Sequence, residues 1–299
     1  MEWTFEFICR PMGKLTEGPV WDGEVLRFSQ IHASRILEYD PRKGDISEWR
    51  SGINRTNGLA YDDAGRLFGC SSGGRSILRF DPDGTNKVIV DRFEGKRLGT
   101  PNDLAIDSKG RIWFSNPWNA GNVDPNPPEE LDHRSVMRAD PQPDGSYTLT
   151  RVTFDTTMPN GVLLSADQTI LYVAESNLEA AFVRQLRAYP IQADGSLGPY
   201  RLLHTFGSDS IGGHRGVDGM CLDADGNIIA CAGWMRAGPG PMIYVFSPTG
   251  RVIETHRTPC RQPTNCCFGG PDMSTLFVTS TDGHLLMAET DRRGFGIYP

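Results

Sequence analysis

A short phrase recurs six times along this 299-residue chain and constrains its fold more than any other feature. Each copy begins with a polar residue and continues with an apolar run, and most copies are followed by a turn and a second apolar run. The copies are Glu17-Gly-Pro-Val-Trp, Asn57-Gly-Leu-Ala-Tyr, Asn102-Asp-Leu-Ala-Ile, Asn160-Gly-Val-Leu-Leu, Asp218-Gly-Met-Cys-Leu and Asn265-Cys-Cys-Phe. Their leading residues are 40, 45, 58, 58 and 47 positions apart. A period of this length with β-type patterning is typical of a propeller whose repeats are four-stranded blades.

The spacing predicts an all-β, six-bladed propeller that forms a single domain over residues 1–299. We expect the strands of the first two blades near 17–21, 24–29, 35–39 and 46–50, and near 57–61, 66–71, 75–80 and 86–90. Those of the third and fourth are expected near 102–106, 111–115, 134–139 and 147–152, and near 160–164, 169–174, 184–190 and 200–206. The fifth blade is expected near 218–222, 227–232, 241–246 and 251–257.

The sixth repeat is too short for a complete blade. It offers three strand-like runs, near 265–268, 274–280 and 284–289. The segment from Thr4 to Cys9 alternates polar and apolar residues with the period of a strand. We therefore expect the N-terminal strand to complete the last blade, which would leave no open sheet edge at the junction.

Composition narrows the classes of function. The net charge of −7 argues against a nucleic-acid partner. No run approaches the roughly 20 apolar residues that a membrane span needs, and the N-terminus lacks the pattern of a secretory signal. The seven cysteines are an odd number without a repeated pairing pattern, which favours the reducing cytoplasm as the location.

The third repeat contains a long insertion, Asn116 to Glu130, which is rich in Pro, Asn and Gly. Such a composition argues against regular structure. Loops of this length often act as lids or binding loops. A passive excursion over the surface is the alternative.

The leading residues of the six phrases form a candidate ligand ring. The first strand of each propeller blade lines the central channel, so these side chains should converge at one end of it. Two carboxylates and several amide oxygens make a donor set that suits Ca²⁺ or Mg²⁺, and no His or Cys, the preferred ligands of Zn²⁺, stands at a leading position. Asn or Asp followed by Gly is also a common turn signal, which is the alternative explanation for any single copy.

Several of these motifs resemble the senescence-marker-protein/gluconolactonase family, which includes luciferin-regenerating enzymes. The segments that carry the resemblance are Glu17-Gly-Pro-Val-Trp21, Pro101-Asn-Asp-Leu-Ala105, Pro159-Asn-Gly161, Val217-Asp-Gly219 and Cys266-Cys-Phe-Gly-Gly270. The resemblance covers essentially the whole chain. It implies a six-bladed propeller with one catalytic divalent cation. For this chain we expect Ca²⁺, with Zn²⁺, Mn²⁺ or Mg²⁺ as alternatives.

The resemblance also implies individual roles. Glu17, Asn160 and Asp218 match the family's metal ligands, and Asn102 matches a position that binds the metal in some members and the substrate in others. Thr100 stands where the animal sugar lactonases have an arginine that grips the sugar acid. This departure brings the sequence closer to the bacterial gluconolactonases and the drug-responsive lactonases.

The expected chemistry is hydrolysis of a small lactone. A cation would polarise the lactone carbonyl, and Asp218 would take a proton from the attacking water. Because a metal-bound carboxylate is a weak base, Asp218 could instead serve mainly as a ligand. In the phosphotriesterase relatives the equivalent aspartate is proposed to attack the substrate directly.

Other residues are candidates for contact with the substrate. His214 and Arg215 lie in a Gly-rich loop just before Asp218, and Trp118 and Trp234 lie in loops where they could supply an apolar wall. Each also has a structural explanation, as part of a solvated loop or of ordinary packing. Asn57 is a candidate for substrate contact or for a supporting role.

Two neighbouring residues receive structural assignments. Strand alternation predicts that Asp103 points away from the channel. Trp21 is expected between blades, because it ends an inner strand.

Three classes of function remain open from the sequence. The leading one is a metal-dependent lactonase. The second is a phosphotriesterase-like, strictosidine-synthase-like or other esterase activity on the same scaffold. The third is a non-catalytic propeller that binds calcium or docks partners.

Overall fold

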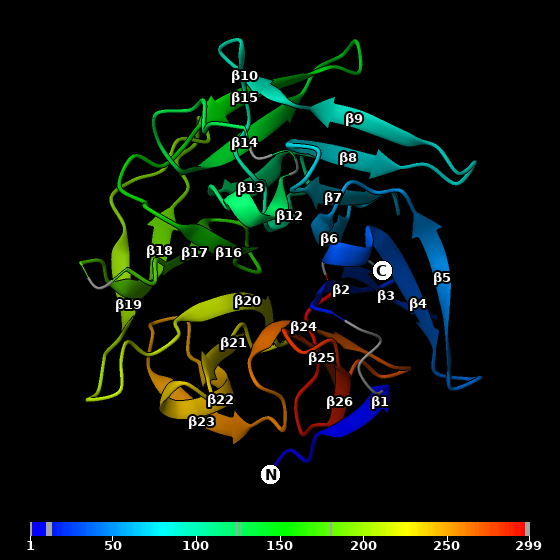
Figure 1. Ribbon diagram of the computed structural model, residues 1–299, viewed down its shortest axis with the longest axis vertical. Helices are drawn as coiled ribbons and strands as arrows, with labels where there is room; N and C mark the ends of the chain where they lie inside the picture. Colours follow the sequence, from blue (N-terminus) through cyan, green and yellow to red (C-terminus); the bar gives the residue numbers. More distant parts are fainter. Residues whose placement is uncertain (1, 10–13, 124, 126, 180, 297–299) are drawn as a thin grey trace.

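The structure of the protein is a computed structural model that describes residues 2–9, 14–123, 125, 127–179 and 181–296. Within these ranges the chain forms six four-stranded antiparallel sheets and one small hairpin. The sheets are arranged in chain order around a central axis, as blades of a propeller (Figure 1). The prediction of an all-β, six-bladed propeller is confirmed.

Each blade runs outward from its first strand. The first two blades contain β2 (Thr16–Trp21), β3 (Leu26–Gln30), β4 (Arg35–Asp40) and β5 (Asp45–Ser51), then β6 (Thr56–Tyr61), β7 (Leu67–Ser71), β8 (Ser76–Phe80) and β9 (Asn86–Val90). The third and fourth contain β12 (Leu104–Ile106), β13 (Ile112–Asn116), β14 (Ser135–Pro141) and β15 (Tyr147–Arg151), then β16 (Pro159–Leu164), β17 (Ile170–Ser176), β18 (Arg184–Pro190) and β19 (Arg201–Phe206). The fifth contains β20 (Val217–Leu222), β21 (Ile228–Trp234), β22 (Ala237–Phe246) and β23 (Val252–Arg257).

The last blade combines both ends of the chain. Its strands are β24 (Pro263–Gly269), β25 (Thr275–Ser280), β26 (Leu285–Glu289) and β1 (Glu6–Cys9). β1 pairs antiparallel with β26, so the N-terminal strand forms the outer edge as predicted (Figure 1).

Short elements complete the described chain. They are the hairpin of β10 (Arg92–Phe93) and β11 (Lys96–Arg97), and the 3₁₀ turns η1 (Ile31–Ala33) and η2 (Ala120–Asn122). No pattern in the sequence indicated this hairpin. Among the described residues there is no helix with the length and apolar character needed to cross a membrane.

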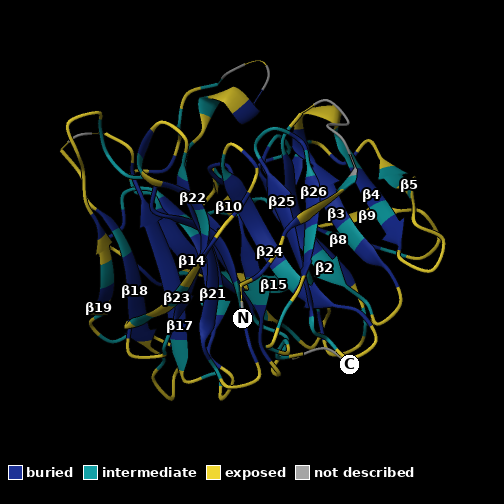
Figure 2. Cartoon of the chain, turned by 90° about the horizontal axis from the view of Figure 1, so that it is seen from below, coloured by how far each residue is buried: buried dark blue, intermediate teal, exposed yellow. Residues whose placement is uncertain are grey.

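Apolar side chains pack between neighbouring blades rather than in one central core. Phe68 and Phe114 share a cluster between blades two and three, and Phe28 and Phe277 share one between blades one and six. Figure 2 shows the strands largely buried and the exposed residues concentrated in the connecting loops. The centre of the ring is therefore free for polar side chains.

A β-bulge interrupts the inner strand of five blades where the leading residue of the phrase lies. The pairing shifts between Glu17 and Val20 in β2, and comparable shifts occur in β6, β16, β20 and β24. A bulge re-aims the side chain beside it. The phrases are thus irregular strands, and the turn interpretation of their Asn-Gly and Asp-Gly pairs does not hold.

The glycine after the leading residue allows neighbouring inner strands to come close. A Cβ on Gly161 would lie 2.3 Å from the Asp218 carbonyl oxygen, and one on Gly219 would lie 2.0 Å from Asn265 Cγ. Neither position has room for a larger residue. The Gly of the phrase is therefore required by the packing at the axis.

Candidate active site

Five of the six leading residues meet in one polar cavity. The cavity has a volume of about 390 Å³. Its lining includes one leading residue from each of five blades: Glu17, Asn57, Asn102, Asn160 and Asp218. Each stands at or near the start of its inner strand, so all five reach the same end of the channel. The convergence expected from the sixfold phrase is therefore present in the structure.

The sixth leading residue, Asn265, lies outside this lining. Its side chain interacts with the carboxyl groups of Glu17 and Asp103 and partly offsets the rise in the pKa of each. It also accepts a hydrogen bond from the Cys266 backbone N–H at 2.8 Å. Asn265 thus supports the acidic residues from within the channel.

Three donors hold the Asp218 carboxylate in place. Asn160 Nδ2 donates to Asp218 Oδ1 at 2.7 Å, and Gln262 Nε2 donates to Oδ2 at 3.0 Å. Arg215 forms an ion pair with Oδ2 at 2.9 Å, and both partners are buried. Because Asn160 uses its amide nitrogen on Asp218, its Oδ1 is the atom left to act as a ligand.

A second and a third carboxyl group lie close to Asp218. Burial, followed by repulsion from Asp218 and Asp103, raises the pKa of Glu17 well above its ordinary value. Burial is also the main cause that raises the pKa of Asp103 to about 7. No described cation forms an ion pair with Glu17 or Asp103, so the acidic charge at the channel exceeds what Arg215 neutralises.

This environment fits a divalent cation. Glu17, Asn160 and Asp218 offer hard oxygen donors, the type that Ca²⁺ and Mg²⁺ prefer. Asn57 Oδ1 is buried and has no hydrogen-bond partner among the described residues. The same residues contain no group of three or more His, Cys, Asp or Glu with metal-binding geometry, so amide oxygens would have to complete the site.

The orientation predicted for Asp103 is wrong. Its Oδ1 accepts from the Leu104 N–H at 3.0 Å and its Oδ2 accepts from the Val162 N–H of the next blade at 3.4 Å. The side chain therefore lies between inner strands and interacts electrostatically with Glu17 and Asp218. Simple alternation fails because β12 begins only at Leu104, after Asp103.

Four residues expected at the pocket do not line this cavity. Thr100 is buried, and its hydroxyl donates to the Pro117 carbonyl and accepts from the Asn119 N–H. Trp118 packs against the Arg75 guanidinium at 5.2 Å. His214 lies 3.4 Å from Asp209, and Trp234 packs against Arg236. Loop membership in the sequence did not indicate which way these side chains point.

The insertion between β13 and β14 contributes to the cavity wall. Asn119, Gly121 and Asn122 from η2 and the residue before it line the cavity. The Asn119 side chain accepts from the Gly121 N–H at 3.1 Å and fixes this turn. Of the two alternatives for this segment, the structure therefore favours the binding loop.

Four polar residues of the lining were not predicted from the sequence: Gln262, His32, Thr264 and Thr281. Gln262 stands three residues before Asn265, just as Arg215 stands three residues before Asp218, and both contact Asp218. That shared offset could have revealed Gln262. His32 lies in η1, where no repeated motif points to it; burial, then the nearby Lys14 and Arg55, lower its pKa.

Comparison with known proteins agrees with this architecture. The family model described as the SMP-30/Gluconolactonase/LRE-like region matches residues 15–282. A gluconolactonase of Zymomonas mobilis subsp. mobilis is 30% identical over 285 residues, which cover 89% of this chain and 76% of the relative. A 6-deoxy-6-sulfogluconolactonase of Pseudomonas putida is 26% identical over 94% of this chain and 88% of its own length.

Solved structures show the same arrangement. A gluconolactonase from Xanthomonas campestris superposes with a TM-score of 0.79 at 30% identity, over 96% of this chain and 89% of that one. A calcium-binding regucalcin from Agrobacterium tumefaciens has a TM-score of 0.76 at 20% identity over 99% and 96% of the two chains, which supports the fold alone. This chain belongs to the SMP-30/gluconolactonase/LRE-like family.

Proposed function

We propose that this protein is a lactonase that hydrolyses a sugar-type lactone. The observation that carries the proposal is the meeting of Glu17, Asn160 and Asp218 in one polar cavity of a gluconolactonase-family propeller. Relatives along most of the chain bear the names gluconolactonase, 6-deoxy-6-sulfogluconolactonase and pentonolactonase. The substrate class that these names share is a cyclic ester of a polyhydroxy acid.

The residues present would hold one divalent cation, for which Ca²⁺ is our first choice. Glu17, Asn160 and Asp218 would be its ligands, with Asn102 as a further ligand or a substrate contact. When bound, the cation would act as a Lewis acid toward the lactone carbonyl. The buried excess of carboxylates supports this assignment, because buried acids without a counter-charge destabilise the fold.

Asp218 is the group that we assign to proton transfer. Asn160, Gln262 and Arg215 fix both of its oxygens, so the carboxylate has a defined orientation toward the cavity. A water molecule that attacks the lactone carbon would give its proton to this carboxylate. The ring C–O bond of the resulting tetrahedral intermediate then breaks, the proton passes from the carboxyl group to the leaving ring oxygen, and the product is the open hydroxy acid.

The walls of the cavity suit a polyhydroxylated substrate. Asn57, Asn102 and Asn119 can each donate and accept hydrogen bonds. The cavity volume of about 390 Å³ lies within the range of small-molecule sites, roughly 300–1,000 Å³. These features favour a compact sugar-sized ring over a long or purely apolar substrate.

The proposal is tested by hydrolysis assays over a panel of sugar lactones, with an aryl ester and an organophosphate included, in the presence of Ca²⁺. The wild type should hydrolyse a sugar lactone in preference to the ester and the organophosphate. Asp218→Asn should lower kcat/KM for that lactone by at least about 100-fold, since general base catalysis contributes about 10²–10⁴.

The matched control is Asp225→Asn, because Asp225 is an exposed residue in the turn after the same strand. This control should retain full activity. Preference for the organophosphate or the aryl ester, or no turnover of any lactone, would contradict the proposal. So would an unchanged kcat/KM in Asp218→Asn.

A further inference from the structure

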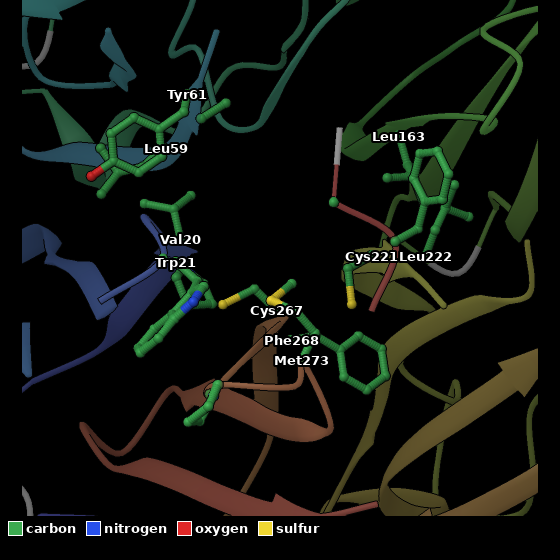
Figure 3. Close-up of a pocket in the computed structure, with 17 residues that line it drawn as sticks. Val20, Trp21, Leu59, Tyr61, Leu163, Cys221, Leu222, Cys267, Phe268 and Met273 are labelled. Carbon is green, nitrogen blue, oxygen red and sulfur yellow. The ribbon is translucent and has the colours of Figure 1, made fainter. Parts of the chain in front are cut away.

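A second cavity lies at the opposite end of the channel. It has a volume of about 530 Å³ and a largely apolar lining, shown in Figure 3. Trp21, Tyr61 and Leu222, which end the inner strands β2, β6 and β20, are part of this lining. The candidate active site is built from the starts of the same strands. The side chain of Trp21 is thus half-buried at this cavity, where it also stacks on Phe277.

Two thiols lie in the wall of this second cavity. They belong to Cys221 of β20 and Cys267 of β24, and both are half-buried (Figure 3). Small solutes that enter the cavity can therefore reach the sulfur atoms of Cys221 and Cys267.

Cys221 is in direct contact with a third thiol, Cys266. The two sulfur atoms are 3.7 Å apart, although the residues lie 45 positions apart in the sequence. Cys221 belongs to blade five and Cys266 to blade six, so the contact joins the inner strands of neighbouring blades. Cys266 is only 3% exposed and, unlike Cys221, does not line the cavity.

We propose that Cys221 and Cys266 form a disulfide bond between blades five and six when a peroxide enters the second cavity. The contact of the two sulfur atoms and the opening of the cavity onto Cys221 carry this proposal. Neither thiol lines the candidate active-site cavity, so the inference does not depend on the proposed function.

The reaction balances with one peroxide and two thiols. The Cys221 sulfur attacks one peroxide oxygen, an S–O bond forms, the O–O bond breaks, and the thiol proton leaves with the departing hydroxide as water. The Cys266 sulfur then attacks the sulfenic acid of Cys221. The S–S bond forms as the S–O bond breaks, and the second thiol proton leaves with the hydroxyl group as water. The thiols lose two electrons and the peroxide gains them.

The two sulfur atoms, 3.7 Å apart, have to move closer for the bond to form. A disulfide brings the sulfur atoms to about 2.05 Å, so rotation of the two side chains has to close the remaining gap. Hydrogen bonds from the Cys221 and Cys231 thiols lower the pKa of Cys266, whereas the same contact and burial raise the pKa of Cys221. Because a thiolate is the reactive form, the oxidation should accelerate as the pH rises.

Two other cysteines could compete. Cys231 also lies within hydrogen-bond reach of Cys266, but it is fully buried and does not line the cavity. Cys267 lines the cavity but packs with the cluster of Phe28 and Phe277 on the blade-one side. The access of Cys221 and its contact with Cys266 thus favour one pairing over the others.

The test uses the full-length protein, treated with hydrogen peroxide and then, after the peroxide is removed and the protein is unfolded in denaturant, with N-ethylmaleimide. Peptides are digested without reduction and analysed by mass spectrometry. We expect a Cys221–Cys266 linked peptide that disappears on reduction with dithiothreitol. Stable oxidation of Cys221 to the sulfinic acid, or a Cys231–Cys266 link in its place, would overturn the proposal.

Variants assign the pair independently. In Cys221→Ser the linked peptide is absent, and Cys266 should remain labelled by N-ethylmaleimide to at least about ten times the wild-type extent after peroxide treatment. Cys267→Ser is the matched control, because it removes the other thiol of the same cavity, and it should form the link at the wild-type level. Equal protection of Cys266 in the wild type and in Cys221→Ser would overturn the proposal, and so would loss of the link in Cys267→Ser. The wild-type measurement stands even where a variant fails to fold.

Discussion

The Asp218 carboxylate owes its position to residues from three blades. Asn160 of blade four, Arg215 before the inner strand of blade five and Gln262 before that of blade six all contact it. Removal of a neutral donor leaves the carboxylate in place but less well oriented. Positioning residues of this kind typically change metal affinity or activity by about 10–100-fold.

Gln262→Ala is therefore expected to lower kcat/KM for the preferred lactone by about tenfold and to raise the Ca²⁺ concentration needed for half-maximal activity. The reason is the lost hydrogen bond to Asp218 Oδ2. A Ca²⁺ titration of the activity measures both quantities. Gln262→Glu tests the amide directly: a carboxylate cannot donate this bond, so this variant should not restore wild-type behaviour. An unchanged Ca²⁺ requirement in Gln262→Ala would remove Gln262 from the site.

Glu17 is predicted to destabilise the folded protein when no cation is bound. Its pKa in the folded protein is raised by burial and by repulsion from Asp218 and Asp103. At pH values above the ordinary carboxyl pKa, the folded state therefore binds more protons than the unfolded state. Stability of the chelated protein must then fall as the pH rises from about 4, and for Asp103 this decline continues to about pH 7.

We expect Glu17→Gln to raise the melting temperature of the chelated protein at pH 8 by about 2 °C or more, the shift that about 1 kcal/mol gives in a large domain. The same substitution should weaken stabilisation by Ca²⁺, because it removes a ligand. Thermal melts between pH 4 and 8, with chelator and with Ca²⁺, measure both effects. A lower melting temperature in chelator would show that Glu17 is stabilising without a cation, against this account.

At the scale of elements, ring closure depends on the N-terminal segment. Trp3 stacks on His256 with ring centroids 3.9 Å apart, and its indole N–H donates to Asp291 at 2.9 Å. It is buried together with residues of blades five and six, just before β1 joins β26. The side chain thus fastens the last strand of the propeller to its neighbours.

Trp3→Ala should reduce the free energy of unfolding by about 3–5 kcal/mol, as is typical when a large buried aromatic residue is truncated. Urea unfolding followed by circular dichroism measures the loss. Phe7→Ala is a matched control from β1 itself, because Phe7 is 47% exposed and should have a small effect. Equal stability of Trp3→Ala and wild type would mean that closure does not depend on this contact.

The sequence predicted the elements better than the irregularities inside them. Period and patterning located the inner strands and the closure by β1, because burial between blades imposes a regular apolar pattern. The bulges escaped prediction, since they lie where the inner strands of neighbouring blades approach each other closely. Thr100 and Trp118 were misplaced for a related reason: their orientation depends on contacts with Pro117 and Arg75, which no local pattern encodes.

At the scale of the whole molecule, the central channel has a polar cavity at one end and a largely apolar cavity at the other. Polar leading residues gather at one end and apolar strand ends at the other, because every inner strand repeats the same polar-to-apolar phrase. Each of the six copies belongs to the inner part of one blade. Five of them also line the polar cavity, while Asn265 braces Glu17 and Asp103 behind it.

We propose above all that hydrolysis of a sugar lactone by this protein requires a divalent cation at the polar end of the channel. The most direct measurement is the initial rate of lactone hydrolysis after exhaustive chelation, followed by readdition of Ca²⁺, Mg²⁺, Mn²⁺ or Zn²⁺ in parallel. We expect a loss of at least about 100-fold on chelation, within the range that such electrostatic stabilisation supplies, and recovery with at least one of the four ions. Full activity of the chelated protein would contradict this proposal.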